Sequence, residues 1–262
     1  MPALILASAS PRRSELLRQA GYAFTVVPAQ GEEKRTSTVP SELVLDLSRQ
    51  KAEEVRERLR TSGGIARFFA AAAMTGAENP PAGGKLPEAA VRSRSFVVLG
   101  ADTVVAVDGE VLGKPQDEAD AFRMLALLRG RAHEVYTGVT LLAGEETEVD
   151  DSEADGKKAD GGKESDGKAD FGKRDGVPAP ERENACASFF VRTEVVFDAI
   201  SDAELRAYIA SGEPMDKAGA YGIQGALASY IREIRGDYYN VVGLPLCETR
   251  RRLRAFGIAP RF

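Results

Sequence analysis

Two hydroxyl-bearing and two guanidinium-bearing residues lie close together near the start of the chain. Ser8 and Ser10 precede Arg12 and Arg13, where a short apolar run gives way to a predicted helix. The free N–H groups and the positive dipole end at a helix N-terminus favour anions. Arginine adds a planar pair of donors that matches phosphate oxygens. The segment indicates a phosphate-binding turn; the alternative is an ordinary helix cap beside two surface arginines.

A carboxylate and a lysine form a second candidate group. Asp102 and Thr103 follow the apolar run 96–99, where we expect a strand to end, and Lys114 follows the next turn. In open α/β sheets, ligands and catalytic carboxylates gather at the carboxyl ends of strands. An Asp that only makes a turn after a strand is an equally good interpretation of this motif by itself.

The third candidate is the glycine-rich stretch 212–225. Gly219, Gly222 and Gly225 recur at every third residue, which would let the backbone approach a ligand closely. The side-chain amide of Gln224 offers both a donor and an acceptor, as the reader of a nucleobase edge requires. The alternative is a long flexible loop without a ligand.

Four other residues carry little information singly. Glu33 offers oxygen atoms to a metal ion, although paired glutamates are more often a surface run, and Lys51 has no specific signal. His133 is the only histidine, so histidine-cluster metal sites are excluded; we interpret it as a hydrogen-bonded structural residue. Cys247 is interpreted as a small core residue. Two cysteines make no disulfide framework.

An alternation of apolar patterns predicts the elements that position these residues. Strands are expected at 3–7, 22–27, 96–99, 104–107, 110–112, 134–142, 187–197 and 227–235. Helices are expected at 11–20 behind a Ser10 cap, 41–60, 117–128, 201–211 and from 245 onward. Strands and helices alternate early and strands cluster later. The pattern predicts an α/β fold with a mixed central sheet flanked by helices.

Two segments interrupt this pattern. Residues 145–183 contain 14 acidic and 7 basic side chains, few apolar ones and a loose Asp-Gly-Lys repeat, so we expect a disordered insert. Residues 61–94 are expected to be a loop with one short helix around 65–74. Removing segments of 34 and 39 residues from 262 leaves 189, an ordinary size for one domain.

The charge distribution argues against several classes of protein. The formal net charge is −5, but the acidic insert alone carries −7, so the remainder is near neutral at +2. A nucleic-acid-binding module would need a clear basic excess. No apolar run approaches the length of a membrane span, and the N-terminus is a poor signal peptide. We therefore expect a cytoplasmic protein.

Seven sequence motifs follow one another along the chain. They read LASASPRRSELL at 6–17, EEK at 32–34, RQKA at 49–52, LGADTVVAVDGEVLGKP at 99–115, GRAHEVYTGV at 130–139, EPMDKAGAYGIQG at 213–225 and GDYYNVVGLPLCET at 236–249. Together they resemble the Maf family of nucleoside triphosphate pyrophosphatases. The resemblance covers the chain apart from the two inserts, so it implies a single domain over 1–262.

The resemblance implies a fold like that of the inosine-triphosphate pyrophosphatases, with a substrate cleft over the mixed sheet. It implies cleavage of a nucleoside triphosphate to the monophosphate and pyrophosphate with Mg²⁺ or Mn²⁺, and a homodimer. The wording is similar to that of the branch acting on dTTP and UTP. Two alternatives remain open: the same chemistry on a modified nucleotide, or a nucleotide-binding regulator of cell division with little turnover.

Residue roles follow from the same resemblance, position by position. Asp102 matches the catalytic position, and Glu33 with Asp102 matches the metal ligands. The positions implied to set substrate specificity are Arg12, Thr103 and Gln224. Those implied to bind the phosphates are Ser8, Ser10, Arg13, Lys51 and Lys114.

Overall fold

A seven-stranded mixed sheet organises the computed structural model, which describes residues 2–60, 95–145 and 185–262. The strands are β1 (Ala3–Leu6), β2 (Thr25–Val26), β3 (Ser95–Val107), β4 (Glu110–Leu112), β5 (Ala132–Glu145), β6 (Cys186–Phe197) and β7 (Ile231–Arg235). Their order is β2-β1-β3-β5-β6-β7, with β4 paired to β3. β1 runs parallel to β2 and β3, and the other pairs are antiparallel. The predicted α/β fold with a mixed sheet is confirmed.

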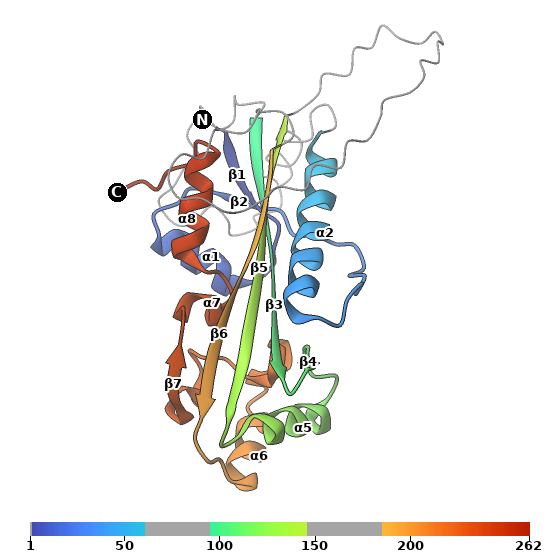
Figure 1. Ribbon diagram of the computed structural model, residues 1–262, viewed down its shortest axis with the longest axis vertical. Helices are drawn as coiled ribbons and strands as arrows, with labels where there is room; N and C mark the ends of the chain where they lie inside the picture. The colour runs from blue at the N-terminus through green and yellow to red at the C-terminus, as the bar shows by residue number, and fades with distance from the viewer. Residues whose placement is uncertain (1, 61–94, 146–184) are drawn as a thin grey trace, which may run out of the picture.

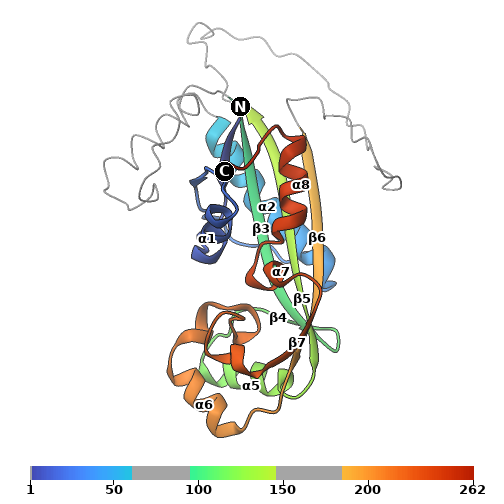
Figure 2. The same cartoon turned by 90° about the vertical axis from the view of Figure 1, so that its left-hand side faces the viewer.

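Helices cover both faces of the sheet. They are α1 (Pro11–Gln19), α2 (Pro40–Arg60), α5 (Glu118–Leu128), α6 (Asp202–Ala210), α7 (Tyr238–Val242) and α8 (Leu246–Ala255), with short 3₁₀ turns η1 (Glu213–Asp216), η2 (Ala218–Ala220) and η3 (Ala226–Tyr230). Figures 1 and 2 show α2 on one face, α1, α7 and α8 on the other, and α5 and α6 at the end of the sheet reached by β4 and β7. Separate apolar clusters fill the three regions between these layers.

β3 differs from its prediction, and the difference matters for the site. The apolar run 96–99 does not end at Leu99; the strand continues to Val107 because β5 pairs with it throughout, from Ser95 opposite Glu145 to Ala106 opposite Glu134. The predicted strands 96–99 and 104–107 are therefore one strand. The periodicity of apolar residues could not show this, because pairing with β5 extends the strand through residues 100–103, which lack a strand pattern of their own.

Two glycines bring α2 unusually close to the sheet. A Cβ at Gly100 would lie 2.1 Å from the carbonyl oxygen of Ser48, and a Cβ at Gly138 would lie 2.2 Å from that of Val44. Glycine is required at both positions because a real Cβ cannot come so near a backbone atom. The close approach fixes the distance between α2 and the centre of β3.

Other differences lie at the ends of elements. The predicted strand 22–27 is reduced to Thr25–Val26, and the predicted strand 227–235 is the 3₁₀ turn η3 followed by β7. The strands predicted on either side of the acidic insert do form an antiparallel pair, β5 with β6. The predicted disorder of 145–183 and the short helix near 65–74 lie outside the described residues, except that Glu145 ends β5.

The predicted N-cap position of Ser10 is confirmed, whereas the prediction that Cys247 is a core residue is wrong. Ser10 occupies the N-cap position of α1, but its side chain makes no capping hydrogen bond; its backbone N–H donates to Ser8 Oγ at 3.2 Å instead. Cys247 is exposed, because it lies on the outer side of α8. Within residues 2–60, 95–145 and 185–262, every helix is too short or too polar to span a bilayer.

The only histidine is a core residue, as predicted. His133 is 2% exposed, and its Nε2 lies 2.8 Å from the hydroxyl of Tyr221. The ring packs edge-on against Phe197, with centroids 4.9 Å apart. Burial, and then the charge of Arg131, lower the pKa of His133 to about 4. The imidazole is therefore neutral in the folded protein at pH 7.

This buried histidine predicts an acid-labile contribution to stability. In the unfolded chain its pKa is near 6.5, so between about pH 6.5 and pH 4 the unfolded state binds more protons than the folded state. The free energy of unfolding should fall by about 3 kcal/mol over that window. Urea unfolding of the wild type and His133→Gln at several pH values measures this contribution. The variant should show a flatter profile, and parallel profiles would contradict the assignment.

Candidate active site

A cavity of about 700 Å³ opens where β1 ends, between α1, α2, β3 and the η1–η2 region. All ten candidate residues line it: Ser8, Ser10, Arg12, Arg13, Glu33, Lys51, Asp102, Thr103, Lys114 and Gln224. They come from six separate segments of the chain, so the fold brings together what the motifs suggested only one by one.

The end of β1 creates this cavity. The parallel register stops at Leu6 opposite Leu99, and the last ladder bond runs from the Ala7 N–H to the Leu99 carbonyl at 2.8 Å. The chain then turns into α1 while β3 continues. Asp102 and Thr103 thus lie in mid-strand rather than after a strand, but just beyond the carboxyl end of β1. The prediction that Asp102 follows the end of its own strand is therefore wrong; Asp102 reaches the cavity because β1, beside it, ends first.

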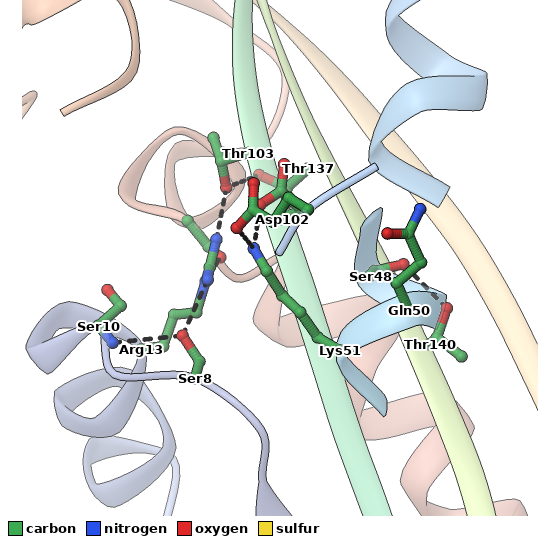
Figure 3. Close-up of polar contacts among 12 residues, drawn as sticks. Ser8, Ser10, Arg13, Ser48, Gln50, Lys51, Asp102, Thr103, Thr137 and Thr140 are labelled. Atoms are coloured by element: carbon green, nitrogen blue, oxygen red, sulfur yellow. Dashed lines mark hydrogen bonds and ion pairs between the residues drawn. The ribbon is translucent and has the colours of Figure 1, made fainter. Parts of the chain in front are cut away.

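Arg13 ties three segments together at the base of the cavity. Its Nε donates to the Gly243 carbonyl at 2.8 Å, and its Nη1 and Nη2 donate to the hydroxyls of Ser8 and Thr103 at 2.9 and 3.0 Å. Figure 3 shows the guanidinium between these two hydroxyls. Burial lowers the pKa of Arg13, and the nearby charge of Asp102 opposes that shift. Arg13 therefore positions the turn and adds a positive charge beside the cavity.

Thr103 belongs to the same network. Its Oγ1 lies 2.9 Å from Thr137 Oγ1, which donates to the Asn240 carbonyl at 2.8 Å. With Arg13 on its other side, the hydroxyl has two partners within the protein. Thr103 is therefore fixed in one orientation at the cavity wall.

Lys51 lies between the two candidate carboxylates. Its ammonium pairs with Asp102 Oδ1 and with Glu33 Oε1, the latter at 3.0 Å, and Figure 3 shows it directed at Asp102. Partial burial opposes ionisation of Glu33, but Lys51, followed by Lys114 and Arg35, lowers its pKa below the usual value. Glu33 is thus charged at neutral pH.

The two carboxylates fit a hard divalent cation in part. No group of three or more His, Cys, Asp or Glu side chains suited to a metal occurs in the described ranges. Mg²⁺ is usually held by one or two carboxylates together with water and substrate phosphates. Glu33 and Asp102, already close enough to share one ammonium, provide such a pair.

The opposite wall is formed by η1, η2 and the residues around Gln224. Arg12 Nη1 reaches across to Asp216 Oδ2 at 3.5 Å, and Lys217 Nζ lies 2.7 Å from the other oxygen of the same carboxylate. The two walls are thus joined by an ion pair at the cavity. Because Arg12 is only partly buried, this contact is weak and open to competition from a bound anion.

The glycines of this wall lie against side chains of the protein itself, and Gly222 and Gly225 also line the cavity. A Cβ at Gly225 would lie 1.6 Å from Glu213 Oε1, and a Cβ at Gly222 would lie 2.8 Å from Lys217 Cε. Gly219, with φ of +67°, packs against Val105. These glycines make room for the protein's own side chains, and their close approach to a ligand stays a prediction.

Four charged residues at the cavity had no role in the sequence interpretation: Arg35, Glu213, Asp216 and Lys217. Arg35 directly follows the motif at 32–34, and the other three belong to the motif at 213–225, so nearness to a motif was the only signal for them in the sequence. With them, six cationic and four acidic side chains line the cavity. The excess of cations suits a polyanionic compound.

An α/β fold with a cation-rich cavity around paired carboxylates defines a protein that handles anionic ligands. A family model described as Maf-like protein matches residues 3–159 and 175–256. The chain belongs to this family.

Three relatives that share one name extend this result. The chain is 40% identical to the dTTP/UTP pyrophosphatase of Agathobacter rectalis, over 98% of this chain and 99% of the relative. It is 37% identical to that of Carboxydothermus hydrogenoformans, over 97% and 98%, and 36% identical to that of Bacillus thuringiensis subsp. konkukian, over 98% and 97%. The chain thus spans almost the full length of each relative.

Proposed function

We propose that this protein hydrolyses dTTP and UTP to the nucleoside monophosphate and pyrophosphate. The observation that carries the proposal is the Glu33–Lys51–Asp102 arrangement in a cavity with an excess of cationic side chains. The names of relatives that align over nearly their whole length support the same reaction. They give no support to a regulator with little turnover.

The cationic side chains suit the phosphate chain. A nucleoside triphosphate carries roughly four negative charges, and positioning and charge neutralisation dominate catalysis of phosphoryl transfer. We assign Arg13, Lys51 and Lys114, with the hydroxyls of Ser8 and Ser10, to the phosphates and the leaving pyrophosphate. Arg12 would exchange its weak contact with Asp216 for a substrate oxygen.

Asp102 is assigned to the attacking water. The water oxygen bonds to the α-phosphorus, its proton passes to an Asp102 oxygen, and the bond to the α–β bridging oxygen breaks with its electrons leaving on pyrophosphate. Lys51 holds the carboxylate in place through the ion pair between them. Mg²⁺ or Mn²⁺, held by Glu33 and Asp102 when bound, would supply further neutralisation of phosphate charge.

The bond that is cleaved can be determined directly. We would hydrolyse dTTP in ¹⁸O-labelled water and identify the products by mass spectrometry. The proposal predicts the label in the monophosphate and unlabelled pyrophosphate, because the water attacks the α-phosphorus. Release of inorganic phosphate with a nucleoside diphosphate, or label in pyrophosphate, would show a different reaction.

Gln224 is assigned to the pyrimidine edge, with Thr103 and Arg12 shaping the same pocket. Gln224→Ala should lower kcat/KM for dTTP roughly tenfold and that for dGTP much less, since the amide hydrogen bonds are lost only for the matching base. The ratio of the two kcat/KM values and the unfolding midpoint are the measurements. Equal losses for both nucleotides would remove Gln224 from base recognition.

The remaining assignments concern the whole chain. We propose that residues 1–262 form one domain, that the protein acts in the cytoplasm, and that it is a homodimer. One sheet shared by the described segments on both sides of each insert supports the first assignment. Sedimentation of the full chain at several concentrations tests the last.

A further inference from the structure

We infer that Glu213 is a positioning residue that fixes Gln224 and thereby sets how well the enzyme discriminates between bases. This inference rests on the proposed role of Gln224 in base recognition. It concerns a residue that lines the cavity and lies outside the phosphate and carboxylate cluster.

The carboxylate of Glu213 holds the segment that follows Gln224. Its Oε2 accepts a hydrogen bond from the Ala226 N–H at 3.1 Å, two residues beyond Gln224. Gly225, between them, packs so tightly on Oε1 that a Cβ there would lie 1.6 Å away. The backbone at 225–226 therefore follows the shape of this one carboxylate.

The Glu213 carboxylate is itself held by a second hydrogen bond. Its Oε1 accepts a hydrogen bond from the Tyr208 hydroxyl at 3.0 Å, and Tyr208 is a core residue of α6. Burial, and then the hydrogen bond to Glu213, raise the pKa of Tyr208, so this hydroxyl stays protonated and remains a donor. Glu213 thus ties the position of Ala226 to Tyr208 on the buried side of α6.

The segment before Gln224 is anchored separately. Tyr221 and Ile223 are buried, and the Tyr221 hydroxyl meets His133 in β5 at 2.8 Å. The Gly225 N–H closes a turn onto the Gly222 carbonyl at 3.0 Å. Gln224 is exposed between these anchored neighbours, at the cavity. The side chain of Gln224 can discriminate between nucleobase edges only if its backbone is held in one position.

Loss of the Glu213 carboxylate should therefore act on selectivity. A freed Ala226 N–H and an empty space beside Gly225 would let the turn move, and the energy of a directional hydrogen bond falls steeply with misalignment. The groups that meet the phosphates and the attacking water are untouched. A substitution that only weakened the fold would lower kcat/KM for all nucleotides by the same factor.

Three variants and a control test the inference. Glu213→Ala should reduce the ratio of kcat/KM for dTTP over dGTP roughly tenfold, toward the value of Gln224→Ala, mainly through KM for dTTP. Glu213→Gln should restore most of the ratio, because its amide oxygen can still accept from Ala226. Glu204→Ala is the matched control: Glu204 also accepts from a tyrosine hydroxyl and a backbone N–H, but these belong to Tyr230 and Ser201 and not to the residues next to Gln224.

The outcomes separate this inference from the proposed function. An unchanged ratio in Glu213→Ala, with a reduced ratio in Gln224→Ala, would overturn the positioning role alone. An unchanged ratio in Gln224→Ala would instead overturn the role of Gln224 in base recognition. An equal fall of the ratio in Glu204→Ala would show a general effect of instability. If Glu213→Ala does not fold, Tyr208→Phe removes only the supporting hydroxyl and should lower the ratio in the same direction; an unchanged ratio there would count against the inference.

Discussion

Asp102→Asn should lower kcat for dTTP by about 10²–10⁴-fold while leaving the fold intact, because loss of a general base typically costs that much. Asparagine has the same shape, so the strand pairing of β3 with β5 at this position is preserved. Lys51 loses one partner but keeps Glu33 at 3.0 Å, so its ammonium is not left unpaired. The expected effect is therefore on the chemical step. Saturation kinetics and the thermal unfolding midpoint measure the two quantities separately.

A matched substitution controls for the loss of a carboxylate on the same hairpin. Asp108 lies in the turn between β3 and β4, pairs with Arg131 at 2.6 Å, and has a φ of 50° that asparagine also tolerates. Asp108→Asn should leave kcat unchanged. Wild-type turnover in Asp102→Asn would remove this residue from the reaction.

Gly100→Ala should cost stability by about 3 kcal/mol and reduce the activity of the folded fraction. The added methyl would meet the Ser48 carbonyl at 2.1 Å and the Ala52 side chain at 2.9 Å, so α2 must move away from β3. Lys51 immediately precedes Ala52, so the same movement withdraws its ammonium from Asp102. Denaturant unfolding and kcat/KM per folded molecule give the two effects.

Gly144→Ala provides the comparison for this second prediction. There the added methyl would meet the ring of Phe96 at 2.5 Å, a side chain that is not part of the cavity lining. We expect lower stability with an unchanged kcat/KM. If Gly100→Ala kept full activity per folded molecule, the close approach of α2 to β3 would contribute only to stability and would not position Lys51.

The sequence predicted the site better than it predicted the elements that carry it. Three features have local signals in the sequence, and each is present: Ser10 before Pro11 where β1 turns into α1, Asp108-Gly109 in the β3–β4 hairpin, and the Ser201–Glu204 capping box that begins α6. All ten candidate side chains line one cavity, because the motifs that contain them meet in the folded chain. Their individual roles remain proposals.

What the sequence could not predict depends on partners far away in the chain. The continuation of β3 through Asp102 comes from its pairing with β5. This pairing leaves no trace in local periodicity. Arg35 was missed for the same reason: only the folded chain brings it beside Gly113 and the cavity.

Pyrophosphate release from a panel of nucleotides tests the central claim most directly. The full chain would be assayed with dTTP, UTP, dCTP, dATP and dGTP, each with Mg²⁺ and with Mn²⁺, and nucleotide binding would be measured in parallel. We expect pyrophosphate release from dTTP and UTP well above that from the purine nucleotides. Binding of these nucleotides without pyrophosphate release from any of them would contradict it.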